Sequence, residues 1–208
     1  MKEKETERLI NLKKIEENLH EKGIENICGI DEAGRGPLAG PVVVAGVIMP
    51  RNSFIEGVND SKRVSEKKRE ILYDKIIEEA ISYSVSIIDY DVIDEINILN
   101  ATKKGVTEVV KGLNVKPDLI IIDALKDIDT CKIPYESIIK GDAKCYSIGA
   151  ASIIAKVTRD RIMREWDKVY PQYGFAKHKG YGTAEHIAAI KEYGLCPIHR
   201  KTFTTHFI

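Results

Sequence analysis

The chain has 208 residues, a length that one hydrophobic core commonly serves, so a single domain is expected over residues 1–208. Apolar residues make up 43% of the sequence, which excludes an intrinsically disordered chain. Lys plus Arg and Asp plus Glu each number 32, which excludes a uniformly basic coat for nucleic acid. The balance is uneven, because residues 156–208 hold 10 basic against 5 acidic side chains. An acidic front and a basic end favour a protein that holds cations beside a bound polyanion.

Neither a membrane anchor nor a secretory leader is expected, and the prediction is a cytoplasmic protein. The longest apolar runs, such as residues 42–49, are far shorter than the roughly 20 residues that span a bilayer. Residues 1–10 mix charges of both signs and precede no apolar stretch, unlike a signal peptide. The four cysteines form no C-x-x-C pair, and a chain of this size needs no disulfide staples, so reduced and partly buried thiols are expected. They are Cys28, Cys131, Cys145 and Cys196.

The first 50 residues predict a helix and then two strands. Apolar residues recur at helical spacing in residues 5–22, which indicates an amphipathic lead-in helix within the first 25 residues. Short apolar strands are expected over residues 26–31 and 42–49. The glycine- and proline-rich residues 34–41 between them predict a turn.

The middle of the chain alternates helices and strands. Ser65 is expected to cap a helix that runs to about Ala80, and residues 82–88 alternate as a strand does. A helix is predicted over residues 92–113. The almost entirely apolar residues 119–123 that follow are typical of a central, buried strand.

The last third predicts one more strand and two helices. The strand covers residues 135–139, and the longest helix covers residues 147–170. Residues 174–182 are expected to be a loop, after which Thr183 caps a helix that ends at Tyr193. Strands that come first and then alternate with helices favour an α/β or α+β fold around one mixed sheet.

Asp31 and Glu32 follow the first strand directly and are the first candidates for chemistry. Side chains alternate along a strand, so both carboxylates serve one site only if the strand ends there or a backbone carbonyl replaces one of them. A dinucleotide-binding turn is excluded, because Gly34, Gly36 and Gly40 do not have its spacing and a strand follows. The alternative is an ordinary charged strand end at the surface.

Asp123 ends the most apolar strand, where an uncompensated charge costs free energy. Metal ligation is one way to compensate it; a helix cap or an ion pair with Lys126 is another. The fourth carboxylate stays open between several aspartates. Asp160 lies four residues after Lys156, so a helical ion pair accounts for it. The remaining candidates are Asp127, Asp129 and Asp142.

Three or four carboxylates without His or Cys form an oxygen-only ligand set, which suits Mg²⁺ or Mn²⁺ rather than zinc. Two such ions about 3.5–4 Å apart activate a water and stabilise the departing oxygen of a phosphodiester. With a basic C-terminal quarter to bind the backbone, this points to hydrolysis of a nucleic acid.

The segment from Gly29 to Pro41 resembles the opening signature of the ribonuclease HII family, and its Gly-Arg-Gly triplet distinguishes that family from ribonuclease HIII. Six further segments match in the same order between Ile27 and about Phe203. They are Asn59-Asp60-Ser61-Lys62, Ile122-Asp123, Lys140-Gly141-Asp142, Ser147 to Lys156, Lys179-Gly180-Tyr181-Gly182-Thr183 and His199-Arg200-Lys201. The N-terminal 25 residues lie outside these motifs, and Thr202 stands where the family pattern has Ser.

The resemblance implies a ribonuclease H-like α/β fold: a mixed five-stranded sheet flanked by helices, with additional C-terminal helices. It implies four metal-binding catalytic carboxylates and so favours Asp142 over Asp160. They are Asp31, Glu32, Asp123 and Asp142. They are expected to hold two Mg²⁺ or Mn²⁺ ions.

For the substrate, the resemblance implies that Gly34, Arg35 and Gly36, together with Tyr181, sense the 2′-hydroxyl and adjoining phosphate at a junction of RNA and DNA. From the residues alone, the favoured interpretation of Tyr181 is structural, either an exposed loop aromatic or a plug of the local core. Lys62 becomes a candidate phosphate contact. Lys156, Lys177 and Lys179 are weaker candidates, for which an ordinary solvated side chain is the alternative. Phosphate binding or helix capping is open for His199 and Arg200.

The expected activity is a metal-dependent endoribonuclease that acts as a monomer. It hydrolyses the RNA strand of RNA-DNA hybrids and cuts 5′ of single ribonucleotides in duplex DNA, leaving a 5′-phosphate and a 3′-hydroxyl. The alternatives are another nuclease of the same fold and a hybrid-binding protein without catalysis. Clustered acids speak against the second, since they repel a polyanion unless metals neutralise them.

Overall fold

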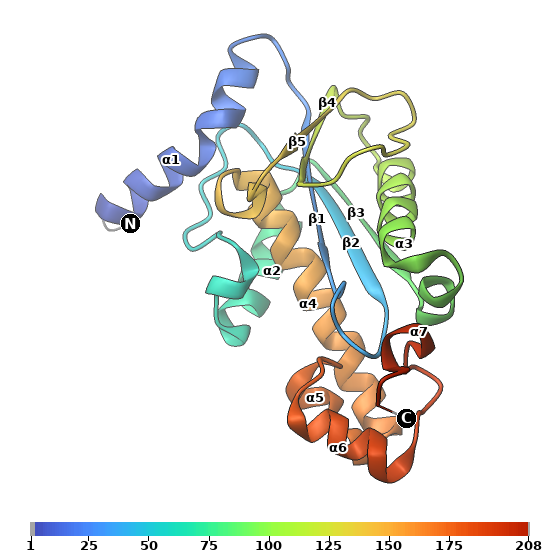
Figure 1. Cartoon of the computed structure of the whole chain (residues 1–208). Helices are drawn as coiled ribbons and strands as arrows, with labels where there is room; N and C mark the ends of the chain where they lie inside the picture. Colours follow the sequence, from blue (N-terminus) through green and yellow to red (C-terminus); the bar gives the residue numbers. More distant parts are fainter. Residues whose placement is uncertain (1–2, 208) are drawn as a thin grey trace.

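A mixed sheet of five strands lies at the centre of the computed structural model, which describes residues 3–207 (Figure 1). Its spatial order is β3-β2-β1-β4-β5. The strands are β1 (Ile27–Ala33), β2 (Val42–Ile48), β3 (Ser82–Ile88), β4 (Leu119–Asp123) and β5 (Tyr135–Ile138). The central strand β1 pairs antiparallel with β2 and parallel with β4, which confirms the expected mixed sheet.

Helices cover both faces of this sheet. They are α1 (Glu3–His20), α2 (Glu66–Glu79), α3 (Tyr90–Gly112), α4 (Tyr146–Val169), α5 (Phe175–His178), α6 (Ala184–Tyr193) and α7 (Lys201–Thr204). Three short 3₁₀ turns join them: η1 (Ser61–Arg63), η2 (Gly141–Ala143) and η3 (Pro171–Tyr173). In the described residues no helix has the length and apolarity needed to cross a membrane.

The period-two pattern of β2 explains the two layers. Val43 and Val47 pack into a core with α1, α2 and α4, whereas Val44 and Ile48 pack into a second core with α3 on the other face. Figure 1 shows this division, with α3 on one side of the sheet and α2 and α4 on the other. All seven residues of β2 are buried, because both faces of the strand are covered.

The close contact of α4 with β1 depends on Gly29. A Cβ atom at this position would lie 2.3 Å from the backbone carbon of Ser147, so no other residue fits without moving the helix. The long helix α4 therefore begins directly over the central strand.

The N-terminal helix α1 is tied to α4 by Glu16. Its buried carboxylate accepts hydrogen bonds from the backbone N–H groups of Tyr146 at 2.8 Å and Ser147 at 3.0 Å, and from the Ser147 hydroxyl. These N–H groups belong to the first turn of α4. Backbone N–H groups at the start of a helix have no acceptor within that helix. Glu16 thus caps α4 from another element, and α1 is more than a lead-in.

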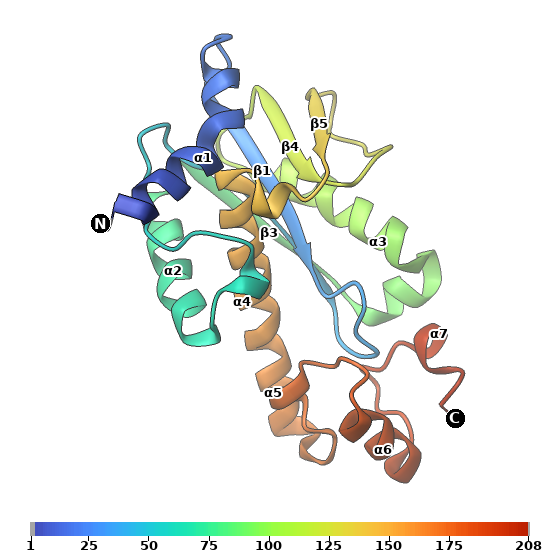
Figure 2. The same cartoon turned by 60° about the vertical axis from the view of Figure 1, so that its left-hand side comes forward.

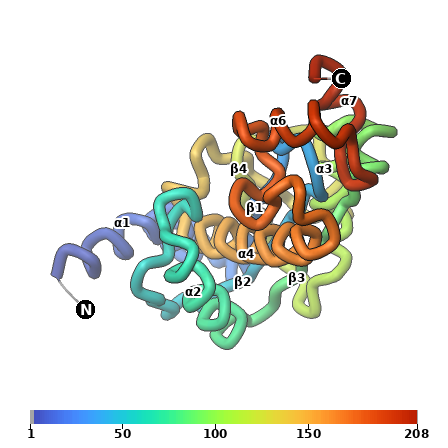
Figure 3. The backbone as a smooth tube through the Cα atoms, turned by 90° about the horizontal axis from the view of Figure 1, so that it is seen from below, coloured from blue at the N-terminus to red at the C-terminus, as the bar shows by residue number. Residues whose placement is uncertain are grey.

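The C-terminal helices α5 to α7 pack on the far end of α4 around a separate apolar cluster (Figure 2). The first and last helices, α1 and α7, lie on opposite sides of the molecule, as Figures 1 and 3 show. This C-terminal cap places residues 178–200 beside the loop that follows β1.

Several sequence predictions require correction. The first strand does not end at Asp31, because the pairs Glu32 with Val44 and Ala33 with Val43 continue the ladder. The helix over residues 92–113 is broken at Asn97, which has a φ of 65°. The expected loop 174–182 contains the short helix α5, and Ser65 makes no side-chain cap, whereas Thr183 does. The prediction for the cysteines is confirmed, since all four are free thiols and three are buried.

Candidate active site

The parallel pairing of β1 with β4 brings two of the four predicted carboxylates together. Ile30 pairs with Ile122, so Asp31 and Asp123 follow neighbouring positions of adjacent strands. Ile30 and Ile122 lie in the core beneath α3, and side chains alternate, so Asp31 and Asp123 face α4.

A hydrogen bond from the Gly141 N–H to Asp123 Oδ1, 2.8 Å long, holds the η2 turn against the end of β4. A Cβ on Gly141 would lie 2.7 Å from Ile148 Cδ1, so glycine is needed for this approach. Lys140 before it adopts the left-handed conformation, with φ 58°. The turn delivers Asp142, which is buried, to the edge of the sheet beside Asp123.

The negative charges of these carboxylates act on one another. Burial raises the pKa of Asp31 well above its usual range, and the charge of Glu32 adds to the effect. Burial also raises the pKa of Asp142, with contributions from Asp60 and Asp123. The ionised groups therefore destabilise one another in the metal-free protein.

Glu32 lies on the opposite side of β1 from Asp31, because the strand continues through both residues. Burial raises the pKa of Glu32, and Asp123 raises it further, while the Arg35 guanidinium at 3.3 Å opposes this. Because β1 ends one residue later, at Ala33, the Glu32 side chain still lies within electrostatic reach of Asp123 and Lys62 at the end of the strand.

The donor chemistry of these residues fits a hard divalent cation. Four carboxylates supply oxygen atoms only, and three of them have a pKa raised by burial and by neighbouring negative charge. A dication relieves this repulsion. In residues 3–207 no group of three or more His, Cys, Asp or Glu is gathered around one metal position.

Lys62 on η1 faces the same carboxylates. Its Nζ lies 3.7 Å from Asp142 Oδ2, and its side chain is 79% exposed. Burial works to lower the pKa of Lys62, but Asp60, Asp142 and Asp31 outweigh it, so the pKa lies above the usual value. The ammonium group stands at the mouth of the acidic cluster.

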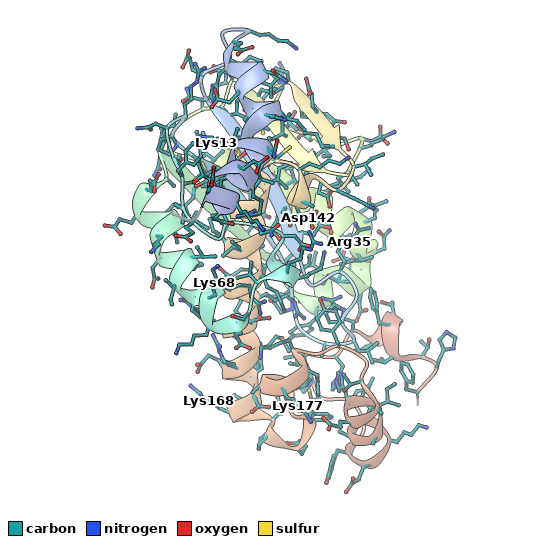
Figure 4. The ribbon with its side chains drawn as sticks, turned by 90° about the vertical axis from the view of Figure 1, so that its left-hand side faces the viewer. Lys13, Arg35, Lys68, Asp142, Lys168 and Lys177 are labelled. Carbon is teal, nitrogen blue, oxygen red and sulfur yellow. The ribbon has the colours of Figure 1, made fainter. Side chains whose placement is uncertain are left out.

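A pocket of about 250 Å³ adjoins the carboxylates. Its lining comes from four separate parts of the chain and includes all the predicted substrate residues. Its lining includes Glu32, Gly34, Arg35, Gly36, Lys62, Lys156 and Tyr181. Asp31, Asp123 and Asp142 do not line it, but Figure 4 shows Asp142 and Arg35 on the same face of the molecule.

The two glycines of the Gly-Arg-Gly triplet have different roles. Gly34 has φ +100°, and a Cβ there would lie 2.1 Å from Arg159 Nε, so this glycine is required for packing. Around Gly36 the nearest atom to such a Cβ is Tyr181 Cε1, at 4.0 Å. Gly36 therefore keeps open the space between the loop and the Tyr181 ring, which is 42% exposed.

Two buried arginines hold the loop that follows β1. Arg200 donates to the carbonyl oxygens of Gly34 at 2.6 Å, Arg35 at 3.0 Å and Gly40 at 2.9 Å. Arg159 donates to those of Ala39, Pro41 and Lys179. Burial lowers the pKa of Arg200 to about 9 and that of Arg159 to about 10. Arg200 is thus a buried scaffold residue, which removes the phosphate-binding alternative.

Two buried histidines, His199 and His186, connect Cys196 to the backbone of Tyr181 through hydrogen bonds. The Cys196 N–H donates to His199 Nδ1 at 2.9 Å, so the proton of a neutral His199 ring is on Nε2. That Nε2 lies 3.0 Å from His186 Nε2, and His186 Nδ1 lies 2.9 Å from the Tyr181 carbonyl oxygen. This pattern assigns the donors: His199 to His186, and His186 to Tyr181. His199 is buried in this chain and does not face a phosphate.

Nothing in the sequence spacing pointed to Arg159 or His186. Both act through backbone carbonyls of distant segments, and such contacts leave no local pattern. The structure does bear out the ion pair predicted for Asp160, whose oxygens lie 2.6 Å from Lys156 Nζ and 3.4 Å from Arg69 Nη2. Lys177 pairs with Glu185 on the surface.

The comparisons with known proteins agree on one family. The family model for ribonuclease HII matches residues 28–206. The ribonuclease HII of Acetivibrio thermocellus is 59% identical over 206 residues, which are 99% of this chain and 80% of the relative. That of Ruminiclostridium cellulolyticum is 53% identical over 208 residues, again 99% of this chain and 80% of the relative.

Solved structures give the same result. The ribonuclease H2 of Pyrococcus horikoshii OT3 superposes with a TM-score of 0.71 at 31% identity, over 85% of this chain and 93% of that one. The complex of PCNA with ribonuclease HII from Archaeoglobus fulgidus contains a chain with a TM-score of 0.71 and 27% identity, over 86% and 94% of the two chains. Bst-RNase HIII in complex with Mn²⁺, with a TM-score of 0.62 at 21% identity over 84% of this chain and 65% of that one, shares the fold.

Proposed function

The chain belongs to the ribonuclease HII family and is an endoribonuclease, and on this premise we propose that it is metal-dependent and cuts 5′ of a ribonucleotide. Its substrates are RNA-DNA hybrids and duplex DNA with single embedded ribonucleotides. The products carry a 5′-phosphate and a 3′-hydroxyl. One chain supplies every residue that the proposal uses, so a monomer with a single catalytic domain suffices.

The four carboxylates have the role of metal ligands: Asp31, Glu32, Asp123 and Asp142. Mg²⁺ or Mn²⁺ held there supplies activation of a water and stabilisation of the departing 3′-oxygen. The raised pKa values of three of these groups support this role, because their mutual repulsion is relieved by a dication.

The remaining site residues bind and orient the substrate. Lys62 stands at the mouth of the acidic cluster and offers a positive charge to the scissile phosphate. The open space between Gly36 and Tyr181 lets the backbone of the loop approach a sugar ring. The 2′-hydroxyl, both donor and acceptor, is the group that separates RNA from DNA at such a place.

The observation that carries the proposal is the adjacency of two features. The acidic cluster at the ends of β1 and β4 adjoins a pocket walled by the Gly34 to Gly36 loop and Tyr181. A DNA-only nuclease of the same fold has no ribose to inspect and no need for that pocket.

The test is a labelled DNA duplex with one ribonucleotide, incubated with Mg²⁺, with Mn²⁺ or with chelator. An all-DNA duplex and the Asp123→Asn variant serve as controls. We expect a metal-dependent cut 5′ of the ribonucleotide that is absent from both controls. Cleavage of the all-DNA duplex would contradict the ribose-sensing role, and binding without cleavage would favour a hybrid-binding protein.

A further inference from the structure

A second concave surface lies between α1 and the turns η1 and η2, next to the proposed active site. It encloses about 430 Å³. We call it the α1 groove; its polar and charged lining consists of Arg8, Asn11, Lys14, Asn59, Arg63 and Lys144. Four of its lining residues are basic and none is acidic. The groove is therefore basic, although acidic side chains outnumber basic ones in residues 1–155 as a whole.

Most of the positive charge in the α1 groove is free to meet a ligand. Lys14, Arg63 and Lys144 are exposed, and none of the ion pairs within residues 3–207 includes them. Arg8 is different, because it pairs with Glu5 at 2.7 Å and donates to the Val58 carbonyl oxygen. Arg8 therefore shapes the wall, and the other three cations face solvent unpaired.

The α1 groove is continuous with the catalytic face. The η1 turn supplies Lys62 to the active-site pocket and its neighbour Arg63 to the groove. On the other wall, the groove residue Ala143 directly follows Asp142. A smaller hollow of about 160 Å³ shares Arg63 and extends the basic surface to Lys68. Figure 4 shows α1, Lys68, Asp142 and Arg35 on one face.

The wall formed by α1 is held in place. Glu16 joins the helix to the start of α4, and the buried Lys13 ammonium donates to the carbonyl oxygens of Arg51 and Ser53. The cations of α1 therefore stand at fixed distances from the η1 and η2 turns, and a ligand that spans the groove does not have to order the helix first.

We infer that the α1 groove is a second binding surface for the phosphate backbone of the substrate duplex, on one flank of the cleavage site. This inference rests on the proposed function. Three unpaired cations and two amide side chains suit a run of phosphates, which take ionic contacts and hydrogen bonds alike. A surface that begins one residue from Lys62 and one from Asp142 is reached by the same duplex that occupies the active site.

The test compares a groove variant with a matched control. The groove variant carries Lys14→Glu, Arg63→Glu and Lys144→Glu. The control carries Lys103→Glu, Lys111→Glu and Lys116→Glu, which change the net charge equally on and after α3, on the other face of the sheet. A Lys14→Gln, Arg63→Gln, Lys144→Gln variant repeats the test if charge reversal impairs folding.

Affinity is measured against salt concentration. Each phosphate contact contributes about 0.9 to the slope of log K against log salt, so the groove variant should lose about 2–3 from that slope and bind about tenfold or more weakly at low salt. The turnover number with saturating substrate should stay at the wild-type value, because no groove residue touches the reacting atoms. The control should match wild type in both measurements.

Nested duplexes identify the flank. Shortening one side of the duplex should weaken binding by wild type and leave binding by the groove variant unchanged, whereas shortening the other side should affect both equally. Equal behaviour of the groove variant and the control, or a loss of turnover without a loss of affinity, would overturn the inference. Failure of wild type to cut the ribonucleotide duplex would overturn the proposed function, and the binding measurements would still decide the role of the groove.

Discussion

At the scale of single residues, the carboxylate of Asp31 works against the stability of the metal-free protein. Burial and the charge of Glu32 raise its pKa well above the usual range, so ionisation costs more in the folded state than in the unfolded chain. We expect Asp31→Asn to increase the free energy of unfolding by on the order of 1 kcal/mol and to abolish cleavage. Urea denaturation with chelator present measures the first effect. A less stable variant would show that the charge is already compensated.

Gly34 and Gly36 are two residues apart, and their substitution by alanine should have different consequences. At Gly34 the protein should lose stability, and at Gly36 it should lose affinity for the substrate. Gly34→Ala places a Cβ 2.1 Å from Arg159 Nε at φ +100°, so it should lower stability by about 2 kcal/mol or more. Gly36→Ala meets nothing closer than 4.0 Å, so the protein should fold normally and lose affinity for the ribonucleotide duplex. Thermal melting and KM separate the two. Equal stability loss in both variants would contradict the division of roles.

His186 makes stability depend on pH. Burial lowers its pKa from the ordinary 6.5 to about 4, so between these values the unfolded chain binds more protons than the folded one. The free energy of unfolding therefore falls as pH is lowered from about 6.5 toward about 4, by up to about 1.4 kcal/mol per pH unit for this proton.

Denaturation of wild type and His186→Gln across this range measures the slope. The variant should show a shallower slope, because it lacks the titrating group. Asp31, Glu32 and Glu16, whose pKa values are raised by burial, contribute in the opposite sense, so the difference between the two proteins is the quantity to compare. An unchanged slope would exclude protonation of His186 as its source.

At the scale of elements, the contact between α1 and α4 depends on one carboxylate. Glu16→Ala leaves the N–H groups of Tyr146 and Ser147 without acceptors, and we expect a loss of about 2 kcal/mol or more. Glu16→Gln keeps one oxygen acceptor and should lose less. Urea denaturation of the three proteins gives the order. Identical stability of the alanine variant and wild type would mean that water satisfies these groups.

The sequence predicted the order of the main helices and strands because their signals are local. Hydrophobic periodicity located α1, α2 and α4 to within about two residues at each end, and Thr183 located the start of α6. The break at Asn97 and the short helix α5 were missed. The break has a local cap, because Asn97 Oδ1 accepts a hydrogen bond from the Asn100 N–H. Helix α5 instead packs Phe175 into the apolar cluster of the C-terminal cap, which periodicity does not report.

Only part of the candidate site could be predicted from local sequence patterns. The carboxylates and the Gly-Arg-Gly triplet stand out because charged and glycine residues follow apolar strands. The choice of Asp142 came from the family resemblance, and the hydrogen bond from Gly141 to Asp123 supplies its physical reason. The contacts of Arg159, Arg200 and His186 with backbone oxygens depend on the assembled C-terminal cap, so no sequence pattern announces them.

At the scale of the whole molecule, α4 connects all the functional parts. Its first turn follows Asp142 and is capped by α1, its middle lines the pocket through Lys156, and Arg159 reaches the loop after β1. The helix is continuous from Tyr146 to Val169. The Asp142 turn, the pocket and helix α1 are therefore all attached to one continuous helix.

Five of the six carbonyl oxygens held by Arg159 and Arg200 belong to the loop after β1, which has a thermodynamic consequence for recognition. Because the loop after β1 is already ordered, its conformational entropy is lost during folding and not when substrate binds. Titration calorimetry with catalytically inactive Asp123→Asn should therefore give a heat-capacity change no larger than the buried contact surface requires, without the large negative contribution of coupled folding. The loop would then recognise ribose in a conformation that it already has before the substrate binds.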